Sequence, residues 1–315
     1  MTAPGSVDFV IVAYHNERET IIDLSSALLR TCREAGRPAA VYVVVNDDTR
    51  FPEETTPPGV RVLSGHGNVG FARGMKLGLA AGDGQHVVLV NPDCLPDDDA
   101  LRDFYGHLIP GCGILVPRLL TGDGEFDYAP YENWTFSPGR KIAEYLCRER
   151  LDGPTTRLLP RFAKAPGAFL GMERTVAEQL DGPFDSTFFL YAEDRDMTDR
   201  ARQAQIPLWF LPGISVTHLG GQSGTNVSSL VSACKTDGTA RVAYRRLGRA
   251  GAALALADMF LVSAIKRTAR RGGTTSPQVR AAERWALRRW IRSGFRETPP
   301  LDQGSLRAVK ERTTA

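Results

Sequence analysis

The sequence predicts an α/β protein with a mainly parallel sheet, helices on both faces of the sheet, and a C-terminal helical extension. Apolar runs rich in β-branched residues alternate with stretches of helical spacing, and polar turns end the runs. The composition then changes after residue 223, where helical patterns replace strands. Of the 315 residues, 42% are hydrophobic and 24% charged, which is typical of a globular protein large enough to bury a core.

Four apolar runs in the first 90 residues predict buried strands. They are residues 7–13, 40–45, 60–63 and 86–90. Between the first two runs, Ile21, Leu24, Leu28 and Leu29 are spaced to share one helical face. The near-continuous apolar character of the runs favours strands covered on both faces, as in parallel sheets.

The pattern weakens beyond residue 103 and returns near residue 166. Residues 113–117 and 206–211 predict strands, Val216 leads into His218, and residues 141–150 predict a helix. Residues 127–138 form an aromatic stretch that includes Trp134, which either stacks on a ligand or packs under its own loop.

The C-terminal part predicts a helix over residues 227–250, an apolar run over residues 252–264, and a loosely ordered end after Pro299. The apolar run is shorter than the roughly 20 residues of a bilayer-spanning helix. A buried helix or an interfacial anchor between basic flanks fits it better.

Charge is unevenly distributed along the chain. Residues 241–315 contain 17 Lys and Arg against 5 Asp and Glu, a net charge of +12. Since the whole chain carries +3, residues 1–240 carry −9. A basic tail on an acidic body predicts an anionic partner surface or, equally well, a solvated helical face.

The five cysteines are scattered, without a CxxC pair, which favours a reducing cytoplasm over a disulfide scaffold. We expect no signal peptide, because the N-terminus lacks a basic segment and runs straight into a strand.

Polar residues follow three of the predicted strands. Tyr14–Glu17, Asn46–Asp48 and Asn91–Asp93 all stand at carboxyl ends of strands, where open parallel sheets bind their ligands. Asp93 there offers an oxygen ligand for Mg²⁺ or Mn²⁺, ions that commonly bridge carboxylates to phosphates. The tripeptide Asn91-Pro92-Asp93 is also a favourable turn, which is the alternative interpretation.

Three acids, Glu193, Asp194 and Asp196, follow the aromatic segment FFLY. Bulky apolar neighbours raise the pKa of a carboxyl group and suit general-base catalysis. The alternative is an acidic first turn favoured by the helix dipole. On a helix, Asp194 and Asp196 do not share a face, so we expect them to have different partners.

Two further features are ambiguous when taken singly. His218 follows a strand and can complete a metal site beside a carboxylate, or serve a structural role. The segment 68–76 combines glycines with Arg73 and Lys76, which can meet a pyrophosphate, or it simply leads into an ordinary helix.

The ordered motifs VAYHNE, VVVND, NVGFARG, NPD, PGAFLG, FFLYAEDRD and HLGGQS resemble the inverting family 2 glycosyltransferases of the GT-A fold, and look closest to rhamnosyltransferase-like members. The resemblance covers about residues 7–223. It implies a nucleotide-sugar-binding catalytic domain over residues 1–225 and a basic, mostly helical extension over residues 226–315. It also implies a transferase that moves a sugar, with rhamnose favoured, from a nucleoside diphosphate to an acceptor hydroxyl.

The resemblance implies roles for individual residues. Asp194 would be the catalytic base, and Asp93 with His218 would bind a divalent metal, Mn²⁺ or Mg²⁺. The residues implied at the donor are Ala13, Tyr14, Asn46, Asp47, Arg73, Lys76, Asn91 and Asp93. The residues expected at the acceptor are Trp134, Gly167, Ala168, Glu193 and Asp196.

The sequence departs from the family pattern at three places. Asn91 replaces the first acid of the family's D-x-D motif, so the metal site has one charge fewer. Asn46-Asp47 reverses the commoner Asp-Asn order, which leaves the base-contacting residue open. Lys76 stands where many relatives have Asn.

The donor is expected to be dTDP-linked or UDP-linked, and the acceptor a glycan, a lipid-linked glycan or a small molecule. We expect a cytoplasmic protein, with peripheral contact to the inner face of the membrane through its basic C-terminal region, and no nucleic-acid partner. The alternatives are a nucleotidyltransferase or another nucleotide-binding α/β enzyme, and a non-catalytic binding protein. A dehydrogenase is disfavoured because no G-x-G-x-x-G follows the first strand.

Overall fold

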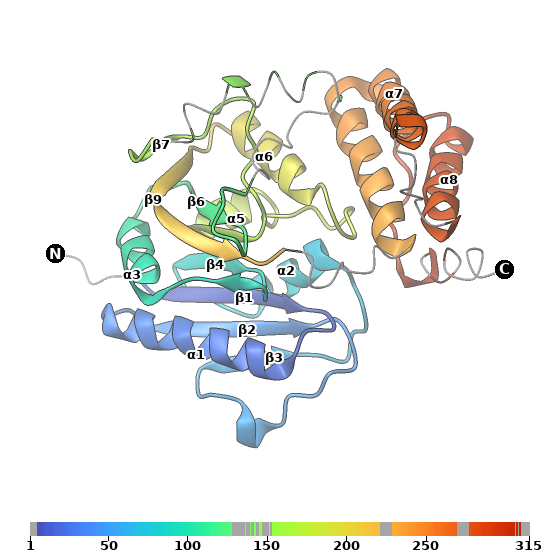
Figure 1. Cartoon of the computed structure of the whole chain (residues 1–315). Helices are drawn as coiled ribbons and strands as arrows, with labels where there is room; N and C mark the ends of the chain where they lie inside the picture. The colour runs from blue at the N-terminus through green and yellow to red at the C-terminus, as the bar shows by residue number, and fades with distance from the viewer. Residues whose placement is uncertain are drawn as a thin grey trace.

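The computed structural model describes residues 5–127, 153–220, 229–269 and 277–305, with isolated positions at 136, 139, 142, 145, 146, 151, 307 and 309. Trp134, most of the predicted helix at 141–150 and the predicted boundary at 225/226 lie outside the described residues. Figure 1 shows a layered α/β body with a group of helices at its side.

The described strands are β1 Val7–Ala13, β2 Ala39–Val45, β3 Val60–Leu63, β4 His86–Val90, β5 Cys94–Leu95, β6 Ile114–Leu120, β7 Arg157–Leu158, β8 Phe169–Glu173 and β9 Leu208–His218. The described α-helices are α1 Arg18–Glu34, α2 Phe71–Ala80, α3 Asp98–His107, α5 Arg174–Gln179, α6 Glu193–Gln203, α7 Ser229–Ala269 and α8 Pro277–Arg292. A short 3-10 helix spans Glu53–Thr55.

All nine described strands join one sheet in the order β3-β2-β1-β4-β8-β6-β9-β5, with β7 paired to β9 (Figure 1). The four strands predicted in the first 90 residues are confirmed, and they pair in parallel. The mainly parallel character continues into the other half, where β6 pairs in parallel with β9. Three strands run against this direction: β8 is antiparallel to both β4 and β6, and β5 and β7 are antiparallel to β9.

Helices cover both faces of the sheet, as the apolar strands predicted. In β1, Phe9 and Ile11 face a core shared with α1 and α3, which includes the predicted helical face at Ile21, Leu24, Leu28 and Leu29. Val10 and Val12 face the opposite core, which includes side chains of α2, α5 and α6. Cys32, Cys94, Cys112 and Cys234 are buried free thiols, and Cys147 lies outside the described residues.

Helix α7 consists of two arms that meet at Gly248, whose φ of 65° and ψ of −155° are not helical. Ala240 of the first arm packs in one buried cluster with Ala252 and Leu256 of the second arm and Trp290 of α8. Because Ala240 and Leu256 are equally far from Gly248 in sequence, this contact shows that the arms fold back on each other. The predicted helix at 227–250 and the apolar run at 252–264 are thus the two arms of a hairpin.

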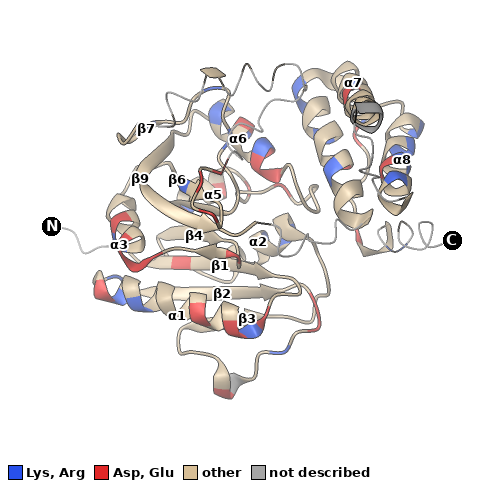
Figure 2. Ribbon diagram, in the orientation of Figure 1, with Lys and Arg blue, Asp and Glu red and all other residues tan. Residues whose placement is uncertain are grey.

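Two arginines of α7 form ion pairs with acidic residues of the same protein. Arg245 contacts Asp185, Asp196 and Glu297 at 2.7–2.8 Å, and Arg246 contacts Asp199 of α6 at 2.6 Å. Figure 2 shows the acidic residues of α6 and the basic residues of α7. These two arginines therefore attach α7 to the acidic body. They are neither a free basic surface nor a solvated face, the two interpretations that the sequence had offered for the tail as a whole.

The chain end after Pro299 was expected to be loosely ordered, and its described part is packed instead. Leu301 is buried with Phe189 and Cys234. The Gln303 side chain donates a hydrogen bond to the Asn68 carbonyl at 2.9 Å. The C-terminal segment thus returns to the loop that precedes α2.

Candidate active site

The first group of predicted site residues lies at the carboxyl ends of β1 and β2. Asn46 directly follows β2, and its backbone N–H donates to the carbonyl of Ala13 at 2.9 Å. The next residue of the first loop, Tyr14, is held by the Asn16 side chain at 2.9 Å. Asp47 accepts a hydrogen bond from the His15 backbone and lies 3.5 Å from the His15 ring. Ala13, Tyr14, Asn46 and Asp47 therefore come together as predicted.

The side chains of Asn46 and Asp47 are both engaged by neighbouring loops. Asn46 is 3% exposed, and its amide donates to the Gly70 carbonyl at 3.0 Å and contacts His66 Nε2 at 3.2 Å. It thus connects β2 to the turn before α2. Asp47 lies beside His15 and Thr49, and their hydrogen bonds outweigh the effect of burial and lower the pKa of Asp47. The Asp47 side chain is only 6% exposed, and its two oxygens accept hydrogen bonds from the backbone N–H groups of His15 and Thr49, so it fixes the first loop to the second.

Asp93 and His218 are 125 positions apart in sequence and are brought together by strand pairing. Cys94 pairs with His218 where β5 meets β9, and the Leu219 N–H donates to the Asp93 carbonyl at 3.0 Å. The side chains follow, with His218 Nε2 at 3.3 Å from Asp93 Oδ1. This short antiparallel contact delivers an imidazole and a carboxylate to one point of the sheet edge.

Asp127, which the sequence had not singled out, completes this cluster. Its Oδ2 lies 3.4 Å from His218 Nδ1, so the imidazole stands between two carboxylates. Burial alone lowers the pKa of His218, but hydrogen bonds and charges from Asp127 and Asp93 outweigh it and raise the pKa to about 9. The same concentration of negative charge attracts a cation.

The donor set fits a divalent metal that relies on its substrate for further ligands. Asn91 Oδ1 is buried without a hydrogen-bond partner among the described residues. In that part of the chain no group of three or more His, Cys, Asp or Glu is arranged to hold a metal. Mg²⁺ and Mn²⁺ sites often have one or two protein ligands and take the rest from phosphates and water. Asp93 and His218 can supply that minimal set, with Asn91 beside them.

Glu193 and Asp194 open helix α6 directly after a strained segment. Tyr191 and Ala192 both have left-handed backbones, with φ values of 69° and 73°. For residues other than glycine this conformation costs about 1–3 kcal/mol and is often found at functional sites. The Lys235 ammonium of α7 lies 4.6 Å from the centre of the Tyr191 ring, so the C-terminal helices contact this segment.

Asp194 is paired with Lys164, a residue that sequence reasoning missed. Lys164 Nζ lies 2.5 Å from Asp194 Oδ2, and the side chains are only 8% and 12% exposed. The other oxygen, Oδ1, accepts a hydrogen bond from the Arg195 N–H at 2.8 Å. The carboxylate is thus fixed in place by a cation and a backbone amide.

The apolar surroundings predicted to raise the pKa of a carboxyl group act on the neighbouring Glu193. Glu193 is buried, and its Oε2 has no partner among the described residues. Burial, together with the nearby charge of Asp194, raises the pKa of Glu193 to about 8. Glu193 therefore holds its proton more strongly than an ordinary glutamate does, whereas the neighbouring Asp194 is paired with the Lys164 ammonium.

The turn before β8 connects this carboxylate to the metal-binding edge. A Cβ on Gly167 would lie 3.5 Å from the Asp194 Cβ, so the turn before β8 passes in close contact with the first turn of α6. The next carbonyl, that of Ala168, accepts the Asn91 N–H at 2.7 Å. Gly167 and Ala168 thus form a continuous path from Asp194 to the Asn91–Asp93 turn.

Two other predicted residues, Asp196 and Lys76, are engaged elsewhere in the structure. Both oxygens of Asp196 are paired, one with Arg200 and the other with Arg245, each at 2.7 Å. Asp194 and Asp196 have different partners, as expected from the helical spacing. Lys76 contacts the exposed Asp181 at 2.9 Å, and Arg73 is exposed on α2.

The missed residues carried only weak signals in the sequence. Asp127 begins the aromatic stretch that had been noted, but nothing in the sequence placed it beside a histidine 91 positions later. Lys164 stands two positions before Pro166, at the start of the PGAFLG motif. Its proximity to this motif was the one sequence signal that could have suggested a contact between Lys164 and the acids at the start of α6.

The sheet order, the helices on both faces and the polar strand ends define a protein of the GT-A fold. Residues 9–163 match the family described as Glycosyl transferase family 2. This part of the chain, just under half of its length, is therefore similar to the family 2 glycosyltransferases. No curated protein matches the chain.

Two solved structures share the fold. A structure of GalNAc-T7 with UDP, GalNAc and Mn²⁺ is 15% identical with a TM-score of 0.53, and the match covers 77% of this chain and 48% of that chain. The mannosyltransferase PcManGT from Pyrobaculum calidifontis, in complex with GDP-Man and Mn²⁺, is 14% identical with a TM-score of 0.50, and the match covers 99% and 88%. This chain spans about half the length of the GalNAc-T7 chain and most of the mannosyltransferase.

Proposed function

We propose that the protein is an inverting glycosyltransferase that moves a sugar from a nucleoside diphosphate to an acceptor hydroxyl. One observation carries this proposal: the Asp93–His218 pair and the fixed carboxylate of Asp194 lie at the same edge of a GT-A sheet, joined through Gly167 and Ala168. The family 2 match over residues 9–163 supports the reaction class.

The residues of the cluster fit a divalent cation, and both solved neighbours contain Mn²⁺ with a nucleotide. In this chain Asp93 and His218 would hold Mn²⁺ or Mg²⁺, with Asp127 orienting the imidazole and Asn91 close by. The bound ion would neutralise negative charge on the leaving diphosphate.

Asp194 is the proposed general base. Its carboxylate would accept the proton of the acceptor hydroxyl as that oxygen attacks the sugar from the face opposite the diphosphate. Attack on that face inverts the anomeric configuration, and positioning both reactants at one strand edge lowers the entropic part of the barrier. Lys164 keeps the base oriented before the acceptor arrives.

The donor would occupy the first half of the sheet. Ala13, Tyr14, Asn46 and Asp47 would frame the nucleoside, with Asp47 holding the first two loops together through His15 and Thr49. Arg73 and Lys76 on α2 are the proposed cations for the diphosphate, and Lys76 would have to exchange Asp181 for it. We propose a dTDP-linked or UDP-linked sugar, with rhamnose favoured on the motif resemblance.

The acceptor would approach the α6 side of the site. Gly167, Ala168, Glu193 and Asp196 line or support that side, and Trp134 is proposed there from the sequence. The acceptor would be a glycan, a lipid-linked glycan or a small molecule. We propose a catalytic unit over residues 1–225 with a helical extension over 226–315, in a cytoplasmic protein with peripheral contact to the inner face of the membrane.

A ligand screen tests this function directly. Thermal stability is measured with UDP, dTDP, GDP and ADP, each with and without Mn²⁺, and sugar nucleotides of the stabilising base are then tested for slow release of the diphosphate. We expect one base to stabilise the protein, and more strongly with Mn²⁺, because the ion joins diphosphate and protein.

The same screen separates the alternatives. A nucleotidyltransferase would consume a nucleoside triphosphate and release pyrophosphate instead of a nucleoside diphosphate. A non-catalytic binding protein would show stabilisation without release. Absence of both stabilisation and release with every nucleotide would refute the proposed function.

A further inference from the structure

The second arm of α7 presents a row of exposed apolar side chains. Leu254 and Leu261 are 58% and 60% exposed and lie two turns apart on one helical face. Ile265, one turn beyond Leu261, is 56% exposed on the same row. Exposed Ala250 and Ala257 belong to this row as well. Exposed large apolar residues that line up in this way mark an interaction surface.

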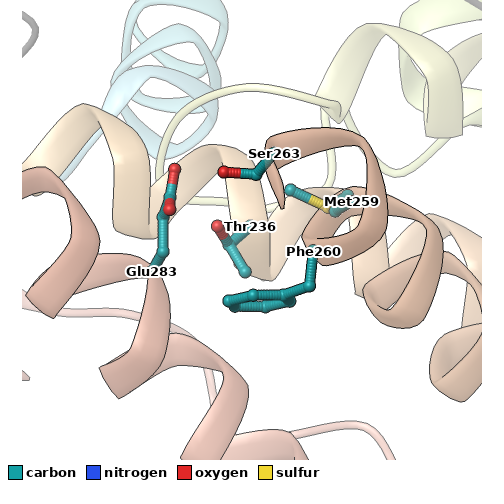
Figure 3. A pocket seen from close by; sticks show the side chains of 5 residues that line it. All are labelled: Thr236, Met259, Phe260, Ser263 and Glu283. Carbon is teal, nitrogen blue, oxygen red and sulfur yellow. The ribbon is translucent and has the colours of Figure 1, made fainter. Parts of the chain in front are cut away.

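The opposite side of this arm is already packed. Ala252 and Leu256 are buried against Ala240 and Trp290. Nearer the end of the arm, side chains of both arms and of α8 line a pocket formed by Thr236, Met259, Phe260, Ser263 and Glu283 (Figure 3). The arm is thus apolar on both sides but uses only one of them within the molecule. A helix that is apolar all round is expected to be covered on every side.

By length and composition, the described part of α7, Ser229–Ile265, is one helix that could cross a membrane, and only 22% of its most apolar window is buried. The break at Gly248 and the packed inner side argue against a straight crossing. An arm attached to the protein along one side and apolar on the other is suited to lie in the plane of the bilayer surface.

Charges at the ends of the exposed row indicate which surface covers it. Arg249 is exposed at the start of the arm, and Asp258 is the only acid between Leu247 and Ile265. The sequence continues with Lys266, Arg267, Arg270 and Arg271, whose side chains lie outside the described part. Basic residues near an apolar helix face favour anionic lipid headgroups, by about 1 kcal/mol each close to a membrane.

A second copy of the chain would also cover an apolar row, but the row lacks the features of a helix pair. Paired helices usually place charged residues beside the apolar seam to set partner and register. Here the half-buried neighbours of the row include apolar Ala253, Phe260 and Val262. Asp258, beside Leu254 and Leu261, is the single acid among them. The apolar face is therefore broader than a seam and has no complementary pattern of charges, as a lipid-facing surface requires.

We propose that the exposed face of the second arm of α7, from Ala250 to Ile265, inserts into the interface of a bilayer that contains anionic lipid. This deepens the membrane location proposed above, but the surface itself does not depend on the reaction. It places the arm in the acyl boundary and Arg249, at the start of the arm, among the headgroups. A transferase held in this way meets acceptors carried on lipid.

Vesicle flotation of the full-length protein tests this surface. Vesicles of phosphatidylcholine alone are compared with vesicles of phosphatidylcholine mixed with phosphatidylglycerol, at low and high salt. The double substitution Leu254→Glu with Leu261→Glu should lower the bound fraction on the anionic vesicles at least about tenfold, because it removes two inserting side chains and adds two negative charges. Wild-type binding should fall with salt.

Ile109→Glu is the matched control. Ile109 is 57% exposed and follows α3, on the opposite side of the molecule from α7 (Figure 1). This variant should float like the wild type, and both variants should keep the wild-type thermal stability and donor hydrolysis in solution. Failure of wild-type protein to bind anionic vesicles, or equal binding by the double variant, would overturn the proposal. Conversion of a dimer to a monomer by the double substitution, without vesicle binding, would identify a self-association face instead.

Discussion

Lys164 and Asp194 form a buried ion pair, with Nζ and Oδ2 separated by 2.5 Å. The contact joins the loop before β8 to the first turn of α6. Two further hydrogen bonds support it: Ala165 N–H donates to the Thr198 hydroxyl at 3.0 Å, and that hydroxyl donates to the Asp194 carbonyl at 2.8 Å. The proposed base is therefore oriented before substrate binds, which spares the reaction the cost of ordering it.

Asp194→Asn should remove transfer and leave donor binding intact. The amide keeps the shape of the carboxylate but cannot accept the acceptor's proton. We expect kcat to fall about 10²-fold or more, with the Kd of the nucleoside diphosphate within twofold of wild type. Steady-state kinetics and calorimetry measure the two quantities. Asp199→Asn, one turn further along α6, is the control, and normal transfer by Asp194→Asn would reject the assigned base.

Lys164→Met should slow transfer without weakening donor binding. Without the ammonium, Asp194 Oδ2 loses the contact that orients it, so kcat should fall about tenfold or more while the KM for the donor stays at the wild-type value. Lys164→Arg keeps a donor of the same charge and should restore most of the rate. A wild-type kcat in Lys164→Met, at unchanged thermal stability, would show that the base does not depend on this contact.

Much of the fold followed from local sequence. The strand at Val7–Ala13 and the helical face of α1 have patterns that depend only on neighbouring residues, and both are confirmed. The reversed direction of β8, and of the short strands β5 and β7, was not predicted. Strand direction is set by which strands become neighbours, and β4 pairs with β8 across about 80 residues of chain. A sequence pattern does not contain that information.

The site residues likewise divide into those that a local motif predicted and those that only long-range contacts reveal. Asp93 and His218 were chosen separately, each on a motif, and the structure brings them together through β5 and β9. Asp127 and Lys164 could not be found in this way, because their importance comes only from the residues they touch. The contact between Arg245 and Asp196 could not be predicted either, because it depends on where α7 packs.

Asp127→Asn should weaken metal binding without abolishing it. Asp127 does not stand at Nε2, the nitrogen beside Asp93, but it fixes the orientation of the His218 ring through Nδ1. Loss of such a supporting carboxylate typically costs about 10–100-fold in metal affinity. The apparent Mn²⁺ affinity in the presence of nucleoside diphosphate is measured by titration with electron paramagnetic resonance.

Two further variants serve as controls for the effect of Asp127→Asn on Mn²⁺ affinity. Asp93→Asn should lower the Mn²⁺ affinity more than Asp127→Asn does, because it removes the charged ligand itself. Asp123→Asn, in an exposed position of the same loop as Asp127, should leave it unchanged. Equal affinities in wild type and Asp93→Asn would mean that the metal binds elsewhere.

Glu193→Gln should stabilise the protein at neutral and alkaline pH. The pKa of Glu193 in the folded protein, about 8, lies above its ordinary value of 4.5, so folding favours the protonated form. Its contribution to stability is complete below pH 4.5 and is lost as the pH rises to 8. The variant's advantage should therefore grow across this window by up to about 1.4 kcal/mol per pH unit and then level off.

Urea unfolding at several pH values across this window measures the effect. Glu178→Gln, an exposed glutamate on the loop side of α5, should show no such pH dependence. A constant difference between wild type and Glu193→Gln at every pH would show that Glu193 titrates normally in the folded protein.

Gly238→Ala should slow catalysis from within the C-terminal helices. A Cβ at this position of α7 would lie 2.6 Å from the Tyr191 carbonyl oxygen and 3.0 Å from the Ala192 Cβ. Those two residues hold the left-handed segment that sets the start of α6, so their displacement moves Asp194. We expect kcat to fall about tenfold or more with the KM for the donor unchanged, since small misplacements of a catalytic group are costly.

Helix propensity alone predicts the opposite result for Gly238→Ala, so the two explanations can be distinguished by experiment. Replacing a mid-helix glycine with alanine normally stabilises a helix by up to about 1 kcal/mol. Gly106→Ala in α3 should show that gain without loss of rate, since a Cβ there meets nothing within 4 Å. If Gly238→Ala instead raised the Tm and left kcat at the wild-type value, the Tyr191–Ala192 segment would tolerate displacement, and α7 would not set the position of the base.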